Sequence, residues 1–314
     1  MAGVAFMFPG QGSQRVGMGR DFAESHPELL QRYFEPADEI LGFGLTELCF
    51  EGPDDQLTQT QNTQPALFVV SMAVLDVLRG HGVQAQAAAG HSLGEYSALV
   101  CAGVLDFEDG LRLVRRRGEL MAQVNARTPG AMAAVIGLPP ERVDEVCEAA
   151  RTAGAGIVEA ANYNEPTQTV ISGETAAVDQ ASALMTEAGA ARVVRLQVGA
   201  PFHCSLMDVL SGEFGAELDR YTFRDPQIPV VANFTGDYVR TGAEVKAALR
   251  SQVAGSVRWT DTMRRLAADG CSRFVEAGPG RVLTGFSMKI NPDLAVHSAG
   301  DMKRVDALLA ALPG

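Results

Sequence analysis

The sequence predicts an α/β protein in which a large domain built on a parallel sheet carries a small, inserted ferredoxin-like subdomain. Short apolar runs alternate with helix-period segments through residues 4–125, which is the pattern of a parallel sheet with helices on its faces. Between residues 131 and 197 the order changes to β-α-β-β-α-β, the order of the split βαβ unit. We therefore assign residues 1–127 and 199–314 to a discontinuous large domain and residues 128–198 to the inserted subdomain.

Composition and charge exclude several classes of protein. The longest apolar run, residues 66–78, is broken by Ser71 and Asp76 and is too short to cross a bilayer. A formal net charge of −12 disfavours nucleic-acid binding, which depends on Lys and Arg. The first residues lack the basic region of a signal peptide, so we expect a cytoplasmic protein with no membrane or nucleic-acid partner. The 5 cysteines are scattered without CxxC spacing, which favours neither a disulfide framework nor a zinc site.

The first strand, residues 4–8, leads into a glycine-rich loop at residues 9–14, PGQGSQ. Glycines let a backbone approach another group closely, so this loop is a candidate binding element. It lacks the Lys-Ser/Thr pair of a P-loop, and Arg15 stands where a dinucleotide fingerprint has its third glycine. We therefore expect the loop to bind something other than phosphate.

The inserted subdomain is defined by two helices whose apolar residues recur on one face. The first begins at Pro140 and ends before Gly154, and the second begins at Thr175 and ends before Gly189. Their apolar positions are Val143, Val146, Cys147 and Ala150 in the first helix and Val178, Ala181 and Met185 in the second. Strand-like runs lie at residues 131–138, 157–162, 167–172 and 191–197.

The α/β alternation resumes after residue 199. We expect helices at residues 206–218, 243–253 and 259–268, strands at residues 228–234 and 273–277, a short helix that ends near Lys289, and a final strand and helix. The sequence shows no internal repeat or linker-like stretch, so the two large-domain segments are expected to form one unit.

A serine between glycines, Gly90-His91-Ser92-Leu93-Gly94, follows an alanine run and precedes a helix-like segment. A nucleophile on a sharp strand-to-helix turn needs neighbours without bulk, as in the nucleophile elbow of α/β-hydrolase-like domains. An ordinary glycine-rich turn is the alternative for so short a pattern. Ligands of open α/β sheets bind beyond the carboxyl ends of the strands, where the loops after residues 8, 90 and 277 are expected to lie.

A serine nucleophile needs a general base, and His203 is the candidate among 5 histidines. His203 stands where the chain leaves the insert and begins a helix, a position that a structural histidine also occupies. No triad acid is evident between Ser92 and His203 on the large domain. Either the acid lies elsewhere or a backbone or amide oxygen orients the imidazole. The other histidines are expected to be surface or supporting residues: His26, His81, His91 and His297.

Longer motifs indicate a family that the chain resembles. They are GQGSQ at residues 10–14, GHSLGEYSALVCAGVL at 90–105, the Arg117-Gly118 pair, YN at 163–164, PFH at 201–203 and EAGPGRVLTG at 276–285. In this order they resemble the malonyl-CoA:acyl-carrier-protein transacylases, a family that includes stand-alone acyltransferases serving polyketide synthases in trans. The resemblance covers nearly the whole chain, and it implies an α/β-hydrolase-like large domain with a ferredoxin-like insert.

The resemblance implies an acyltransferase that moves a malonyl or related dicarboxylic acyl group from CoA to the phosphopantetheine thiol of an acyl carrier protein, in polyketide or fatty-acid synthesis. It makes Ser92 the nucleophile, His203 the base, and Gln252 the residue that helps to orient the histidine through an oxygen acceptor. The backbone N–H groups of Gln11 and Leu93 would form the oxyanion hole. Neither a metal nor a bound cofactor is implied.

Arg117 matches the family's arginine that binds the free carboxylate of malonyl. A planar fork of donors suits bidentate recognition of a carboxylate. The helical position of Arg117 is expected to direct it inward while Arg115 and Arg116 point outward. The remaining candidates for contact with substrate are Asn162, at the insert-side wall of the site, Phe202 and His91.

Other functions remain compatible with these residues. A hydrolase of the same fold would strip acyl groups from carrier proteins, but a buried arginine offers nothing to neutral acyl chains. Transfer of methylmalonyl or ethylmalonyl is another alternative, although Phe202 favours malonyl over methylmalonyl. Because acyl carrier proteins are acidic, a basic docking surface is expected at Arg15, Arg281 and Lys289.

Overall fold

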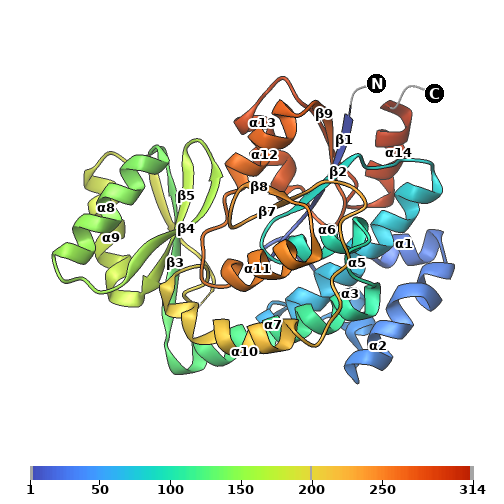
Figure 1. Ribbon diagram of the computed structural model, residues 1–314, viewed down its shortest axis with the longest axis horizontal. Coiled ribbons are helices and arrows are strands. Elements are labelled where there is room, and N and C mark those ends of the chain that lie inside the picture. The colour runs from blue at the N-terminus through green and yellow to red at the C-terminus, as the bar shows by residue number, and fades with distance from the viewer. Residues whose placement is uncertain (1–2, 199, 312–314) are drawn as a thin grey trace.

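A computed structural model describes residues 3–198 and 200–311. Residue 199, at which we place the start of the second large-domain segment, lies outside the described residues. The described chain forms two sheets, A and B, with helices packed around them (Figure 1). None of its described helices is both long and apolar enough to cross a membrane.

Sheet A has six strands in the order β10-β9-β1-β2-β7-β8. Its strands are β1 Gly3–Phe8, β2 Ala87–Gly90, β7 Val230–Ala232, β8 Asp237–Val239, β9 Cys271–Glu276 and β10 Ala295–Ser298. Every pairing is parallel except that of β7 with β8. The sequence predicts a parallel sheet, as the structure shows for β10, β9, β1, β2 and β7, but it does not predict β8. A tight turn at Gly236, where φ is 66°, returns the chain against β7.

Helices cover both faces of sheet A. Phe6 and Phe8 of β1 enter the core formed with α5, Thr60–Gly80, whereas Ala5 and Met7 enter the core formed with α12, Trp259–Ala268. A strand buried on both faces carries a continuous apolar run, which explains the sequence GVAFMF of β1. The other helices around sheet A are α1 Arg20–Ser25, α2 Glu35–Leu41, α3 Leu45–Glu51, α4 Asp54–Leu57, α6 Gly94–Cys101, α7 Phe107–Arg127, α10 Ser211–Leu218, α11 Gly242–Gln252, α13 Val282–Ile290 and α14 Met302–Ala311, with a π-helical turn at Leu30–Phe34.

The single helix predicted at residues 206–218 is divided in the structure. Its first part, Ser205–Leu210, is a 3₁₀ helix, and α10 follows directly. The N–H and the hydroxyl of Ser205 both donate to the carboxylate of Glu159, a residue of β4. These bonds tie the start of the segment to sheet B.

Sheet B is antiparallel, in the order β4-β5-β3-β6, and has the strand order of a ferredoxin-like unit. Its elements are β3 Gly130–Ile136, α8 Pro140–Thr152, β4 Val158–Glu165, β5 Gln168–Glu174, α9 Thr175–Glu187 and β6 Arg192–Arg195. Ala131, Ala133 and Val135 pack against α8 and α9 on the outer face, which Figure 1 shows at the left. Met132 and Ala134 alternate with them and join the main core, so the second face of sheet B covers the large domain.

The two glycines around Ser92 are required by close backbone contacts. A Cβ at Gly94 would lie 2.0 Å from the carbonyl oxygen of Phe8, and a Cβ at Gly90 would lie 1.9 Å from the carbonyl carbon of Gly94. Ser92 itself has a φ of 51°, in the left-handed region. The Gly90–Gly94 stretch is therefore a strained strand-to-helix turn held against the end of β1, as the elbow interpretation predicts.

Gly94→Ala is expected to lower the free energy of unfolding by about 3 kcal/mol, because its Cβ meets backbone atoms that have little freedom to move. Gly285→Ala is the matched control, since this glycine also lies in a helix and its Cβ would have no neighbour within 4 Å. That substitution should raise stability by about 0.5–1 kcal/mol. Urea denaturation of both variants provides the measurement, and a Gly94→Ala protein as stable as its parent would contradict the close approach.

Candidate active site

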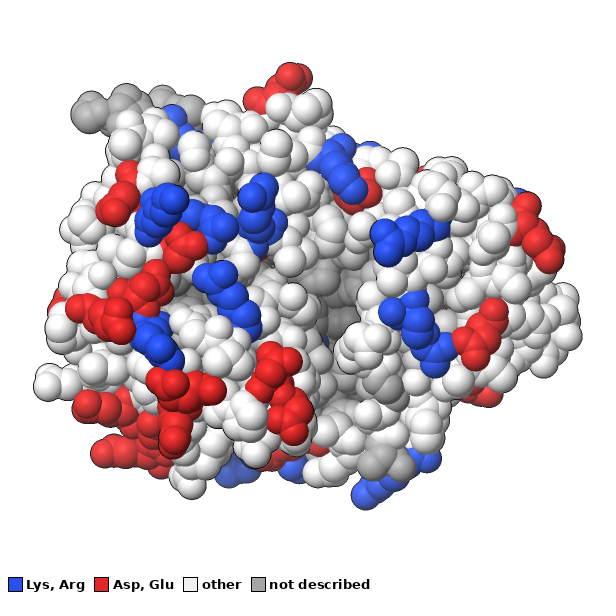
Figure 2. Space-filling model, turned by 180° about the vertical axis from the view of Figure 1, so that it is seen from behind, with Lys and Arg blue, Asp and Glu red and all other residues white. Residues whose placement is uncertain are grey.

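A cavity of about 580 Å³ lies between the two sheets, where Figure 2 shows the surface hollowed, with Lys and Arg on both rims. Segments far apart in the sequence line it: the loop after β1, the Ser92 elbow, α7, β3 and the chain that follows β6. Its apolar lining is Leu93, Met121, Met132, Leu196, Val198 and Phe202, and its polar lining includes Gln11, His91, Ser92, Arg117, Asn162 and His203. Most of the residues singled out from the sequence therefore share one cavity.

The side chains of Ser92 and His203 lie within hydrogen-bonding distance of each other. The Oγ of Ser92 is 2.7 Å from Nε2 of His203. On the other side of the ring, Nδ1 lies 3.0 Å from the backbone oxygen of Gln252 and 3.1 Å from that of Gly255. Because carbonyl oxygens only accept, Nδ1 carries the proton and Nε2 accepts from the serine hydroxyl. Backbone oxygens thus take the place of a triad acid, one of the two alternatives that the sequence leaves open.

His203 is held as a neutral base. It is buried, and burial together with the nearby positive charge of Arg117 lowers the pKa of His203 to about 3. An imidazole with so low a pKa is unprotonated throughout the physiological range, so Nε2 is available to take a proton. Its φ of 58° places a second non-glycine residue of the site in the left-handed region.

Arg117 is buried at the same point, with only 1% of its surface exposed. Its Nη1 donates to Gln64 Oε1 at 2.9 Å, and its Nη2 donates to Gln252 Oε1 at 3.0 Å and to Ser92 Oγ at 3.1 Å. Nε has no hydrogen-bond partner among the described residues. The guanidinium therefore lies beside the Ser92 hydroxyl, and Nη1 and Nη2 make all of its described hydrogen bonds.

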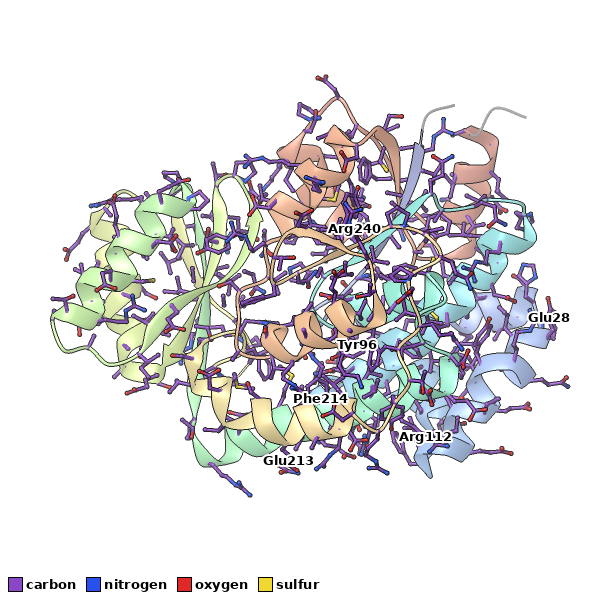
Figure 3. All side chains as sticks on the ribbon, viewed as in Figure 1. Glu28, Tyr96, Arg112, Glu213, Phe214 and Arg240 are labelled. Carbon is purple, nitrogen blue, oxygen red and sulfur yellow. The ribbon has the colours of Figure 1, made fainter. Side chains whose placement is uncertain are left out.

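The neighbouring arginines of α7 are turned differently. Arg112 is exposed and points away from the body, whereas Tyr96 lies in its interior (Figure 3). Arg115 and Arg116 are half-buried and form ion pairs with Glu119 and, for Arg116, also with Glu213. Among these four arginines, Arg117 is the one that lines the cavity.

Gln11 and Leu93, whose backbone N–H groups are expected to form an oxyanion hole, lie on opposite sides of the contact between the first loop and the elbow. Leu93 precedes the first residue of α6, at the end of the helix where the helix dipole favours negative charge. Gln11 lies in the loop after β1, which packs against the elbow so closely that a Cβ at Gly10 would be 2.4 Å from the His91 oxygen. Neither N–H donates a hydrogen bond to another described residue. Both residues line the cavity.

The remaining substrate-site candidates line the cavity from two sides. Asn162 is buried in β4 and Phe202 is buried beside His203. His91 turns its ring toward sheet B, where Nε2 lies 2.9 Å from Oδ1 of Asn164. His91 thus joins the elbow to sheet B while it also forms part of the wall.

The expected docking residues lie outside the cavity. The Arg15 side chain is 54% exposed, and Arg281 is exposed. Their loops are adjacent, since a Cβ at Gly280 would lie 3.3 Å from Cβ of Ser13. Lys289 is also exposed, but its Nζ lies 3.1 Å from Oε1 of the buried Glu165, so it pairs α13 with β4.

Several residues that build the site were not anticipated. Asn233 accepts from the N–H of Ser92 at 2.6 Å and donates to the oxygen of Gly90 at 2.6 Å, which pins the elbow. Asn233 could have been predicted as a site residue from its position directly after β7, at the carboxyl end of a parallel strand. Gln64, which holds Arg117, is a buried polar residue of α5 that directly precedes the apolar run of that helix. Within the described ranges, no group of three His, Cys, Asp or Glu side chains is arranged to hold a metal ion.

An α/β fold that sets a serine, a neutral histidine and free backbone donors on one cavity is the arrangement of enzymes that carry an acyl group on serine. The family model described as acyl transferase domain matches residues 5–309, and the chain belongs to this family of acyltransferases.

Individual relatives agree with this assignment. The chain is 40% identical over 312 residues to a malonyl CoA-acyl carrier protein transacylase of Bacillus subtilis, covering 99% of this chain and 98% of the relative. The structure superposes with a TM-score of 0.95, at 39% identity, on a malonyl-CoA:acyl carrier protein transacylase from Xanthomonas oryzae, covering 100% and 99% of the two chains. The structure also superposes, with a TM-score of 0.95 and 39% identity, on a malonyl-transacylase in complex with its type II polyketide synthase acyl-carrier protein. The match covers 99% of this chain and 100% of the other.

Proposed function

We propose that the chain transfers a malonyl group from CoA to the phosphopantetheine thiol of an acyl carrier protein through an ester on Ser92. The observation that carries the proposal is the 3.1 Å separation between Nη2 of Arg117 and Oγ of Ser92. An acyl group on this serine brings a carboxylate two bonds beyond its carbonyl within reach of the guanidinium. The relatives named for malonyl transfer, one of them bound to a carrier protein, support the same activity.

In the first half-reaction, Oγ of Ser92 attacks the carbonyl carbon of malonyl-CoA as its proton passes to Nε2 of His203. The N–H groups of Gln11 and Leu93 stabilise the oxyanion. The carbon–sulfur bond then breaks, and protonated His203 returns the proton to the departing CoA sulfur. The products are a malonyl ester on Ser92 and free CoA.

In the second half-reaction, the phosphopantetheine thiol of the carrier protein gives its proton to His203 and attacks the ester carbonyl. The bond to Oγ of Ser92 breaks, and the serine regains its proton from His203. The malonyl group leaves as a thioester on the carrier protein. In this proposal neither step requires a metal or a bound cofactor.

The cavity lining bears on the alternatives. A hydrolase acting on neutral acyl chains gains nothing from a cation that is 1% exposed, because such a charge is stable only when it is paired or hydrogen-bonded. Phe202 lines the cavity, and at this position the resemblance to the family favours malonyl over methylmalonyl.

We also propose that the carrier protein docks across the loop of Arg15 and the outer face of α13. Exposed apolar side chains accompany the basic ones there, with Val282 41% and Met288 55% exposed. A basic surface with apolar contacts suits an acidic partner, and it offsets the net charge of −12 on this chain.

Mixing the protein with malonyl-CoA should add one malonyl group to the peptide that contains residues 90–94, because Ser92 is the proposed nucleophile. Intact and peptide mass spectrometry make the measurement, and addition of a carrier protein should move the label to its phosphopantetheine. Ser92→Ala should remain unlabelled, whereas Ser97→Ala, which removes a buried hydroxyl from the helix that follows the elbow, should label normally. Equal labelling of Ser92→Ala would eliminate this mechanism, and loss of the label to water in the presence of carrier protein would favour the hydrolase.

Arg117→Ala should weaken transition-state stabilisation for malonyl by about 2–5 kcal/mol, because the acyl carboxylate loses its partner. Transfer of acetyl should hold steady or improve, and Arg117→Lys should recover little because an ammonium lacks the planar fork. The measurement is kcat/KM for malonyl-CoA and acetyl-CoA with folded variants. Arg116→Ala, which removes an exposed ion pair on the same helix, is the control. A parallel fall for both donors would show that Arg117 is structural.

Charge reversal at Arg15 and Arg281 with Lys289→Gln should raise the KM for carrier protein by about tenfold at low ionic strength, and the effect should shrink as salt is added. Acylation by malonyl-N-acetylcysteamine, which has no phosphates, is the internal control. Charge reversal at Arg142 on α8, an exposed residue of the outer layer, is the matched variant and should change nothing. Unchanged transfer to the carrier protein at low salt would refute this docking surface.

A further inference from the structure

A buried carboxylate stands next to the catalytic residues without a part in the reaction described above. Glu95 lies in the first turn of α6, three residues after Ser92, and is 1% exposed. Its Oε2 accepts from the backbone N–H of Asn233 at 3.0 Å and from Nε2 of Gln252 at 2.7 Å. Both partners are neutral, so the carboxylate is hydrogen-bonded but has no directly bonded cation.

Gln252 connects Glu95 to Arg117. The amide donates from Nε2 to Glu95 and accepts at Oε1 from Nη2 of Arg117, at 3.0 Å. The same Nε2 also lies 3.0 Å from the backbone oxygen of Ser92. One side chain thus separates a buried anion from the buried cation that faces the acyl group.

The charged and titratable groups around Glu95 are few. Arg117 faces it from α7 and Tyr96 adjoins it on α6, while α11 and the loop after β7 present the amides of Gln252 and Asn233. Burial raises the pKa of Tyr96, so the phenol is neutral. Burial also raises the pKa of Glu95 to about 7, against the opposing effects of its hydrogen bonds and of Arg117. Glu95 therefore titrates near neutral pH.

We propose that Glu95 is a specificity-determining residue that acts on Arg117 through Gln252 and sets how strongly the guanidinium attracts the carboxylate of a dicarboxylic acyl group. The inference rests on the proposed malonyl transfer. When Glu95 is ionised, its charge partly balances Arg117 and weakens that attraction. When Glu95 is protonated, the whole charge of Arg117 is available to the acyl carboxylate.

The sign of the pH dependence follows from linkage. An acyl carboxylate beside Arg117 places a second negative charge near Glu95 and raises the pKa of Glu95 further. A state with a higher pKa binds more protons, so malonyl recognition is favoured as the pH falls through the titration of Glu95 and weakened as it rises. Acetyl carries no charge and is insensitive to this titration.

The test is the ratio of kcat/KM for malonyl-CoA to kcat/KM for acetyl-CoA, measured between about pH 5.5 and 8.5. The ratio cancels the ionisation of His203 and of the CoA phosphates, which both donors share. For the parent protein it should fall as the pH rises, by up to about tenfold for each unit by which the acyl carboxylate raises the pKa of Glu95. A flat ratio in the parent protein would overturn the proposal without any variant.

Glu95→Gln removes the charge while an amide oxygen can keep both hydrogen bonds of Oε2, so its ratio should be high and independent of pH. Glu276→Gln is the control. Glu276 is also buried and accepts from backbone N–H groups, but these belong to α13, and Arg117 is not among its partners. It should keep the parent's pH profile. The parent's slope surviving in Glu95→Gln would refute the role of Glu95. Absence of malonyl transfer at every pH would instead contradict the proposed function itself.

Discussion

The catalytic end of the molecule depends on the burial of one cation. Arg117 is withdrawn from water, and a buried guanidinium is stable only when its donors find acceptors. Those acceptors come from α5, α11 and the elbow, as Gln64, Gln252 and Ser92. Three segments that are distant in the chain therefore meet at Arg117, next to the serine and to the residue whose backbone oxygen bonds His203.

The same cation couples substrate choice to proton transfer. Arg117 lowers the pKa of His203, so the imidazole resists the proton that it must accept from Ser92. In the proposed reaction, a carboxylate on the acyl group neutralises Arg117 and removes part of that resistance. A dicarboxylic acyl group thus helps to create the electrostatic conditions for its own transfer, whereas a neutral acyl group leaves the imidazolium next to an unbalanced charge.

The sequence predicted the architecture well where the information lies in neighbouring residues, as in the periodicity of apolar residues or the steric requirement for glycine. The alternation of apolar residues predicted the strands of both sheets and the ferredoxin-like order, and the glycines beside Ser92 predicted a tight turn. It missed β8, because the three residues of this strand, Asp-Tyr-Val, form no apolar run, and it missed Glu95, Asn233 and Gln64. These residues act through contacts between segments at least 53 positions apart, which no local pattern records.

Ser92 and His203 share a left-handed backbone, which glycine adopts without penalty and other residues adopt at a cost. Glycine would be more stable than the native residue at each of these two positions, which are the proposed nucleophile and base. Thermal stability and catalytic activity therefore favour different residues at these two positions. A screen that selected for thermal stability alone would tend to replace Ser92 and His203 while leaving the rest of the fold unchanged.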